Sequence, residues 1–445
     1  MSRGFRPTPV SRRALLGGLL ASGGLALSRP VFASNPDVVI IGAGTAGLAA
    51  ARRLDARGLT WVMLEASGRI GGRAFTEETS LGVPFDQGAS WIHQSNRNPL
   101  TAVAAEAGFT TFNDDDVGGS FYVGDRLATA AEDRQADVAW DGLIGAMSEA
   151  GRRRQDVSAA SVSPRDLPWI QVSETWVGPM SMGRDLENIS CVDWWNMADT
   201  APNLIVKEGY GALVAHYGEG LPVSLNTKAT QVRWGGPGVE VETDKGTISA
   251  KAAIITVSTG VLNAGSLRFD PPLPDWKQEA IAGMPMGLLA KIGLRLSPGD
   301  RYGLRPNGWL SYKVETREAC YFVTWPWDQD TMIGFVGGKF AWDLTKAGSK
   351  AAIDFAVGEL QKTLGAEATK RVIASVWTDW GANPLTLGAY ASALPGQATA
   401  RNKLALPVGE RLYFAGEACA VALAQTVGGA YVTGQKAADA IASVT

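Results

Sequence analysis

The stretch from residue 38 to residue 65 constrains the fold of this 445-residue chain most strongly. The run 38–41 is continuously apolar, as expected for a strand buried on both faces of a parallel sheet. A helix is predicted over 48–57, and a second strand over 60–64 ends at an acidic residue. Between the first strand and the helix the glycines follow the pattern G-x-G-x-x-G, at Gly42, Gly44 and Gly47. This order of elements is typical of a dinucleotide-binding βαβ unit.

Each residue of this pattern has a physical role in such a unit. Gly42 permits the tight turn, Gly44 lets the backbone approach a pyrophosphate, and Gly47 allows the helix to pack closely. The helix N-terminus offers N–H groups and partial positive charge to the phosphates. Glu65 is expected to accept hydrogen bonds from the adenosine ribose hydroxyls.

The segment LEASGRIGGRAFT, residues 64–76, predicts a second approach to the same ligand. Its glycines at 68, 71 and 72 allow the chain to pass close to the pyrophosphate, while Arg69 and Arg73 face the phosphate charge. A plain NAD site does not need this second contact. Taken alone, the two arginines could equally be solvated loop charges.

Size and composition predict a large globular protein without a metal centre. With 46% hydrophobic residues the chain can bury a sizeable core, and its length favours two packed domains. Its three cysteines are scattered and odd in number, which argues against a disulfide framework. No histidine or cysteine pair has metal-ligand spacing, so no metal site is expected.

Residues 1–33 are interpreted as a twin-arginine signal peptide, cleaved after Ala33. Arg12 and Arg13 precede an apolar run that is too short and too rich in glycine to span a bilayer. The sequence therefore predicts export of the folded protein by the Tat machinery into the periplasm, without stable membrane insertion. The mature chain would keep 36 basic and 44 acidic residues, a net charge of −8, because the signal holds five of the 41 basic residues and no acid. Such a surface argues against nucleic acid and suits a cationic small molecule, although solubility alone would also explain it.

Several segments together resemble the flavin-dependent amine oxidases, the family of monoamine and polyamine oxidases. The strongest are GAGTAGLAAARRL, LEASGRIGGRAFT and the C-terminal LYFAGEACAVALAQTVGGAYVTGQKAA. Further similarity lies in residues 85–100, 204–234, 268–296 and 379–396, whereas about 110–200 and 300–370 match poorly.

The resemblance implies an α/β protein, α+β overall, with two interleaved domains. A discontinuous Rossmann-like FAD-binding domain would comprise 35–100, 204–268 and 405–445. A substrate-binding domain with a mixed sheet and helices would comprise 101–203 and 269–404.

The family's FAD contacts are carried over to matching positions of this chain. Val232 is expected to meet the adenine through its backbone, and Thr426 with Val427 to open a helix toward the flavin pyrimidine. Ala389 stands where monoamine oxidases attach FAD through a cysteine, so the FAD is expected to be non-covalent. The predicted FAD-binding residues are Gly42, Gly44, Gly47, Glu65, Arg69, Gly72, Arg73, Ala89, Ser90, Trp91, Val232, Trp380, Gly416, Glu417, Thr426 and Val427.

Four residues are expected, from the same resemblance, to take part in the chemistry. Lys291 resembles the family lysine that holds a water against flavin N5, although strand alternation alone would also allow a solvated lysine. Tyr390 matches one wall of the aromatic pair that flanks the amine. Thr426 replaces the second tyrosine, as in spermine-oxidase-like members. His93 matches the histidine that polyamine and spermine oxidases present to the substrate.

The implied reaction is hydride transfer from an amine to flavin N5, followed by imine hydrolysis and reoxidation by O2 with release of H2O2. The substrate must be neutral, which an apolar aromatic pocket favours. Such a pocket could come from some of the 15 tryptophans, although each is more often part of a core. The tryptophans of the predicted substrate domain considered for it are Trp176, Trp194, Trp195, Trp325 and Trp327.

A polyamine is the favoured substrate, and three alternatives stay open. An L-amino-acid oxidase would need an arginine for the carboxylate, such as Arg184 or Arg295. The others are an amine dehydrogenase that passes electrons to a carrier protein, and a non-catalytic flavoprotein. The sequence does not indicate an oligomeric state. The carboxylates considered for binding the distant ammonium groups of a polyamine are Glu174, Asp185, Glu187 and Asp193, and the sequence does not select one of them.

Overall fold

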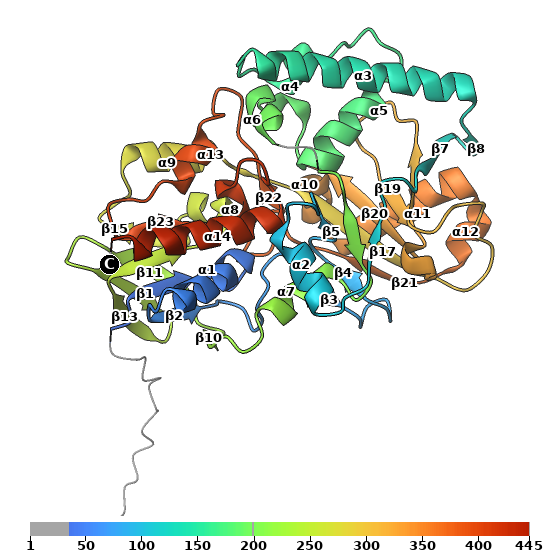
Figure 1. Cartoon of the computed structure of the whole chain (residues 1–445). Coiled ribbons are helices and arrows are strands. Elements are labelled where there is room, and N and C mark those ends of the chain that lie inside the picture. Colours follow the sequence, from blue (N-terminus) through green and yellow to red (C-terminus); the bar gives the residue numbers. More distant parts are fainter. Residues whose placement is uncertain (1–34, 198–199, 445) are drawn as a thin grey trace, which may run out of the picture. The chain divides into compact units, whose positions relative to one another are not determined.

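A five-stranded parallel sheet contains the first predicted strand at its centre, in the order β10-β2-β1-β14-β23 (Figure 1). The computed structural model describes residues 35–197 and 200–444, and the predicted signal peptide lies outside them. All residues of β1 and β14 are buried, as the apolar runs require. The strands are β1 (Val38–Ile41), β2 (Trp61–Leu64), β10 (Val223–Ser224), β14 (Ala252–Ile255) and β23 (Leu412–Phe414).

Two helices from opposite ends of the chain pack side by side on this sheet, α1 (Thr45–Ala56) and α14 (Val427–Ala442) (Figure 1). A Cβ at Gly434 would lie 2.0 Å from the carbonyl oxygen of Ala46, so the close approach needs a glycine there. The helix α1 begins at Thr45, three residues before the predicted start, because the glycine turn is shorter than expected.

Smaller sheets and short helices surround this core. A four-stranded sheet has the order β13-β12-β11-β15, a three-stranded sheet has the order β5-β9-β6, and β3 pairs with β4. The strands are β3 (Thr76–Glu77), β4 (Phe85–Asp86), β5 (Trp91–Ile92), β6 (Thr111–Asn113), β9 (Leu204–Val206), β11 (Ala229–Arg233), β12 (Val239–Thr243), β13 (Gly246–Ala250) and β15 (Arg268–Asp270). The helices are α2 (Pro99–Glu106), α7 (Tyr210–Tyr217), α8 (Thr259–Asn263) and η4 (Glu417–Cys419).

A seven-stranded mixed sheet forms the second large element, in the order β21-β17-β20-β19-β18-β7-β8. The strand next to its β21 edge, β17, carries Lys291 and pairs antiparallel with both β20 and β21. Six of the eight β17 residues are buried, so this strand belongs to the core. The strands are β7 (Gly119–Val123), β8 (Arg126–Leu127), β17 (Leu289–Leu296), β18 (Gly308–Tyr312), β19 (Tyr321–Thr324), β20 (Thr331–Gly337) and β21 (Val372–Trp377), while β16 (Met286–Gly287) and β22 (Tyr390–Ala391) form a separate pair.

Helices cover this second sheet and its surroundings. The longest, α3 (Ala130–Arg152), starts with a capping box between Thr129 and Glu132 and lies over α5 and α6 (Figure 1). The others are α4 (Ala159–Val162), α5 (Ile170–Thr175), the π-helix η1 (Trp176–Met182), η2 (Leu186–Asn188), α6 (Cys191–Asn196), α9 (Asp275–Ala282), η3 (Pro326–Asp328), α10 (Gly338–Ala347), α11 (Ser349–Leu364), α12 (Ala366–Lys370) and α13 (Ala400–Ala405).

The two large sheets draw their strands from separate parts of the sequence. Every strand of the five-stranded sheet lies within the ranges predicted for FAD binding, and every strand of the seven-stranded sheet lies within those predicted for substrate binding. By residue contacts, the described residues 35–197 and 200–444 belong to one compact unit, and the predicted domain boundaries stay a prediction. Within 35–197 and 200–444 no helix has the length and apolar character needed to cross a membrane.

Candidate active site

A cavity of about 1260 Å³ extends from the glycine turn after β1 to the face of the seven-stranded sheet. Its size exceeds the usual 300–1,000 Å³ of small-molecule sites, which suits a dinucleotide together with a second ligand. Most of the predicted site residues line it: Gly42, Gly44, Glu65, Arg69, Gly72, Arg73, Ala89, Ser90, Trp91, His93, Lys291, Trp380, Tyr390, Gly416, Glu417, Thr426 and Val427.

At one end of the cavity the two glycine-rich segments contact each other directly. The backbone N–H of Gly71 donates to the carbonyl of Ala43 over 2.9 Å, and Gly44 forms a bridge with Gly71. A Cβ at Gly72, whose φ is +59°, would approach the Cα of Gly44 to 3.2 Å. The segment LEASGRIGGRAFT therefore packs against the turn that begins α1, and both line the same wall.

Gly47 lies beneath this wall and does not line the cavity. A Cβ there would sit 2.0 Å from the carbonyl oxygen of Gly42, so its glycine serves the packing of α1 on the turn. The N-terminal residues Thr45 and Ala46 of α1 do line the cavity. This places the helix N-terminus, with its free N–H groups, toward an anionic ligand.

Glu65 holds the glycine turn in place. Its Oε2 accepts from the backbone N–H of Ala43 over 2.8 Å, and its Oε1 accepts from both the N–H and the hydroxyl of Ser67. A carboxylate has about four lone-pair positions, so acceptor capacity is left for ribose hydroxyls.

Replacing Glu65 with alanine is therefore expected to weaken FAD retention. The change removes the acceptor for Ala43 as well as the ribose partner, so both the shape of the turn and a ligand contact are lost. Flavin absorbance after exhaustive dialysis measures the effect. Glu78→Ala, which removes an exposed carboxylate outside the cavity lining, is the matched control and should keep its flavin. Equal retention by Glu65→Ala and the control would contradict the ribose assignment.

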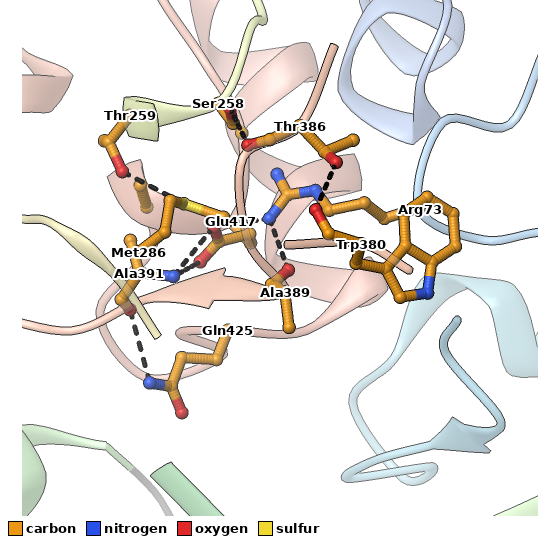
Figure 2. A network of polar contacts seen from close by, with 12 residues as sticks. Arg73, Ser258, Thr259, Met286, Trp380, Thr386, Ala389, Ala391, Glu417 and Gln425 are labelled. Carbon is orange, nitrogen blue, oxygen red and sulfur yellow. Dashed lines mark hydrogen bonds and ion pairs between the residues drawn. The ribbon is translucent and has the colours of Figure 1, made fainter. Parts of the chain in front are cut away.

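The guanidinium of Arg73 connects the two sides of the cavity (Figure 2). It donates to the carbonyl of Ala389 over 2.7 Å and pairs with Glu417 at 3.0 Å. Glu417 also accepts from the backbone N–H of Ala391. Arg69 donates to the carbonyls of Ile70 and Gly72, and its guanidinium carbon lies 3.9 Å from the centre of the Phe75 ring. Both arginines are structural members of the wall, not solvated loop charges, and each keeps free donors for a phosphate.

The C-terminal part of the wall is the start of α14. Thr426 caps this helix, because its hydroxyl accepts from the N–H of Gly429 at 3.0 Å. The same hydroxyl donates to the carbonyl of Leu423, so its hydrogen is already used within the chain. Gln425 precedes it with a φ of +64°, a strained value for a non-glycine residue, and donates to the carbonyl of Ala391 (Figure 2).

Val232 is the other predicted FAD-binding residue that does not line the cavity. It is completely buried in β11, between Val241 of β12 and Phe269 of β15. The cavity wall is instead formed by the residues before it, from Thr227 to Ala229. The predicted backbone contact of Val232 with the adenine therefore stays a prediction, and the lining residues of this segment lie three to five positions before it.

Lys291 is buried at the other end of the cavity. Its Nζ donates to the carbonyls of Asp86 and Gly88, over 2.7 and 2.6 Å, and to the hydroxyl of Ser90. Burial lowers the pKa of Lys291 to about 8, while the carboxylate of Asp86 opposes that shift. A solvated lysine, the alternative that strand alternation allowed, is thereby excluded, since the side chain is 5% exposed.

The hydrogen-bond partners of His93 fix its protonation. The amide Nδ2 of Asn203 donates to Asp115 over 2.6 Å, because a carboxylate only accepts. The amide oxygen then faces Nδ1 of His93 at 2.6 Å, so Nδ1 carries the proton of the ring. Burial lowers the pKa of His93 and favours the neutral ring. Its Nε2 is therefore a hydrogen-bond acceptor.

Aromatic rings form most of the wall between Lys291 and His93. Trp91 stacks on Trp309 with 6.1 Å between ring centres and an interplanar angle of 10°, and it contacts Phe335 at 5.9 Å. Tyr390 donates its hydroxyl to the carbonyl of Ser181 over 2.9 Å. Of the five tryptophans considered from the sequence, Trp176, Trp194 and Trp195 line the cavity, whereas Trp325 is completely buried in the core and Trp327 lies outside the lining.

The carboxylates and arginines considered for substrate contacts lie elsewhere. Asp193 forms a buried ion pair with Arg401, and Glu174 and Glu187 both pair with Arg317. Asp185 is not among the lining residues, and neither are Arg184 and Arg295. Residues that sequence reasoning missed are Asp114, Asp115, Asn203 and Gln425, which line the cavity. Three consecutive aspartates at 114–116 are the one signal that could have drawn attention to this segment.

A FAD-shaped cradle, a buried lysine and an aromatic cavity together define a flavin-dependent amine oxidase. The family model described as flavin containing amine oxidoreductase matches residues 45–172 and 181–442, so the chain belongs to this family. It is 30% identical to Polyamine oxidase 4 of Oryza sativa subsp. japonica over 94% of this chain and 92% of that protein.

Two solved amine oxidases share the fold. Putrescine oxidase bound to putrescine superimposes with a TM-score of 0.75 at 23% identity, covering 92% of this chain and 99% of that one. Cyclohexylamine oxidase from Brevibacterium oxydans IH-35A gives a TM-score of 0.76 at 22% identity, with the same coverage. The protein is thus an oxidoreductase that uses FAD to oxidise amines, and the residues of the cavity fit that cofactor.

Proposed function

We propose that this protein oxidises polyamines or diamines, with O2 as electron acceptor and non-covalently bound FAD. The observation that carries the substrate class is the neutral His93, whose Nε2 offers an acceptor to a substrate N–H inside an aromatic cavity. Similarity to Polyamine oxidase 4 over nearly the full length supports the same class. Amino acids are disfavoured, because neither Arg184 nor Arg295 reaches the cavity to bind a carboxylate.

Bound FAD supplies the hydride acceptor, so the protein needs no nucleophile of its own. The residues of the chain must orient the amine and keep it neutral. A free alkylammonium has a pKa of about 10.4, so deprotonation at pH 7 costs roughly 4 to 5 kcal/mol. The aromatic wall around Trp91 lowers this cost by desolvating the ammonium form. Lys291, at the same wall, can hold a proton at its Nζ, which donates to the carbonyls of Asp86 and Gly88 and to the hydroxyl of Ser90.

The need for a neutral amine predicts a rise of kcat/KM toward alkaline pH. The neutral fraction of the substrate increases about tenfold per pH unit below its pKa. Lys291, with its pKa lowered to about 8, loses its charge within the same interval. We expect kcat/KM to rise at least about tenfold between pH 7 and pH 9. A flat profile from pH 6 to pH 10 would contradict the requirement.

A screen of amines with peroxide detection tests the substrate class. Monoamines, diamines, spermidine, spermine and amino acids are compared at equal concentration, together with bleaching of the flavin under argon. Highest activity with diamines or polyamines supports the proposal, and preference for an amino acid overturns it. Negligible peroxide in air, with turnover sustained by an artificial acceptor, would instead indicate a dehydrogenase.

Non-covalent binding of FAD is supported by Ala389, which offers no thiol at the cavity wall. Within the described residues the cysteines Cys191, Cys320 and Cys419 are all buried, and none lines the cavity. Acid precipitation should therefore release the flavin into the supernatant. Flavin that stays with the precipitated protein would contradict this part of the proposal.

Export to the periplasm by the twin-arginine pathway completes the proposal. Its support is the composition of residues 1–33, with Arg12 and Arg13 ahead of a short apolar run. Cell fractionation tests it, with Arg12→Lys/Arg13→Lys as the variant. Periplasmic activity that disappears in the variant supports export, whereas cytoplasmic activity in both proteins overturns it.

A further inference from the structure

The cavity contains few carboxylates that could bind a cationic group of the substrate. Among the described residues, those that line it are Glu65, Asp114, Asp115 and Glu417. Glu65 and Glu417 belong to the FAD cradle, where they accept from Ala43 and from Arg73 with Ala391. Asp115 accepts three hydrogen bonds from Asn203 and thereby orients His93. Asp114 is the carboxylate whose bonding leaves most capacity for a ligand.

Asp114 has one side-chain partner and no cation. Its Oδ2 accepts from the indole Nε1 of Trp91 over 2.7 Å, and no lysine or arginine in 35–197 or 200–444 pairs with it. The candidate carboxylates elsewhere contrast with this, since Asp193, Glu174 and Glu187 all have arginine partners. Burial raises the pKa of Asp114, and the neighbouring Asp115 adds to that rise. A cation that reached this carboxylate would stabilise its charged form.

A continuous aromatic wall connects Asp114 to the reactive end of the cavity. Nζ of Lys291 lies 5.6 Å from the centre of the Phe335 ring, and that ring contacts Trp91 at 5.9 Å. Trp91 in turn donates to Asp114 and stacks on Trp309. All of these residues line the same cavity. Aromatic faces pack well against methylene chains, so this wall suits an alkyl chain that joins a neutral amine near Lys291 to a second, charged nitrogen near Asp114.

We infer that Asp114 is a specificity-determining residue that binds the second ammonium group of a diamine or polyamine whose first amine lies near Lys291. This inference rests on the proposed function, because it concerns the second nitrogen of that substrate. Trp91 links the two parts of the site, since it lines the cavity and its Nε1 donates to the carboxylate of Asp114. Monoamines would bind along the same wall without this contact.

The inference is tested by binding measurements that need no turnover. FAD-loaded enzyme is reduced with dithionite under argon, and 1,8-diaminooctane and octylamine are titrated calorimetrically. In Asp114→Asn we expect the Kd for the diamine to rise about tenfold and the Kd for octylamine to change less than twofold. Asparagine keeps the size of the side chain and an acceptor for Trp91, so the wall is retained. Asp114→Glu keeps the charge and should keep the preference for the diamine.

Asp116→Asn is the matched control, because Asp116 is exposed and lies outside the cavity lining. It should leave both Kd values unchanged. Equal changes for diamine and monoamine in Asp114→Asn, or an equal loss of diamine binding in Asp116→Asn, would overturn the inference. So would loss of the preference in Asp114→Glu. The proposed function is judged separately, by turnover: selective diamine binding with no amine oxidised would contradict that function and leave the binding site standing.

Discussion

Lys291→Met is expected to slow flavin reduction or reoxidation by about 10²-fold or more while FAD stays bound. The change removes the amino group that donates to the carbonyls of Asp86 and Gly88 and to the hydroxyl of Ser90. Proton handling by a positioned side chain usually contributes 10²- to 10⁴-fold. FAD should remain because the glycine turn and Glu65 are at the other end of the cavity. Stopped-flow absorbance of the flavin, under argon and then with O2, separates the two half-reactions.

A second buried lysine provides the control for this experiment. Lys277 is completely buried, and its Nζ donates to the carbonyls of Lys403, Leu404 and Leu406 near the end of α13. It does not line the cavity. Both Lys→Met variants leave buried carbonyls without a donor, so both should lose about 1–3 kcal/mol of stability. Only Lys291→Met should lose rate. Wild-type rates in Lys291→Met, or equal slowing in Lys277→Met, would remove Lys291 from the mechanism.

The parts of the site that sequence predicted well depend on local structure. A strand, a glycine turn and a helix fix the positions of Gly42 and Gly44 through neighbouring residues, so the pattern is visible in a short stretch. Gly72 packs on Gly44 for the same reason, because the second glycine-rich segment follows directly after β2. The match to a family then gave Lys291, His93 and Tyr390, whose spacing alone would not have revealed a common cavity.

The residues that sequence missed are brought together by contacts between distant segments. Asp115 reaches Asn203 across 88 positions, and Asn203 reaches His93 across 110. No periodic pattern encodes such a pair, and the segment around 110–200 matched the family motifs recognised from the sequence poorly, although the family model extends over most of it. The same limitation explains Asp193, which was considered for substrate binding but pairs with Arg401, 208 positions away. The role of such a polar residue depends on its hydrogen-bond and ion-pair partners, and these partners are known only once the fold is known.

The ion pair between Asp193 and Arg401 leads to the second large prediction, a loss of about 3–5 kcal/mol of stability in Asp193→Ala. Both side chains are almost completely buried, and the guanidinium donates to the two carboxylate oxygens over 2.9 Å each. Arg401 also donates to the carbonyls of Ala391 and Glu417, so it supports the strand of Tyr390 and the turn that is predicted to contact FAD. Removing one partner of a buried pair leaves an uncompensated charge, which is costlier than removing both.

Denaturant unfolding of the FAD-loaded enzyme measures this effect, and a double variant tests its cause. Asp193→Leu/Arg401→Met should recover much of the stability lost in Asp193→Ala, since an apolar pair avoids the buried charge. The exposed pair of Lys350 and Asp354 on α11 is the control, and Asp354→Ala should cost no more than about 0.5 kcal/mol. If Asp193→Ala costs no more than this surface variant, the pair does not hold the C-terminal wall of the cavity. Asp193→Ala is also compared for flavin retention: a variant that loses the expected stability and also releases its flavin more readily shows that the two properties are linked. The link is then explained by Arg401, which holds the carbonyls of Glu417 and Ala391 at the cavity wall.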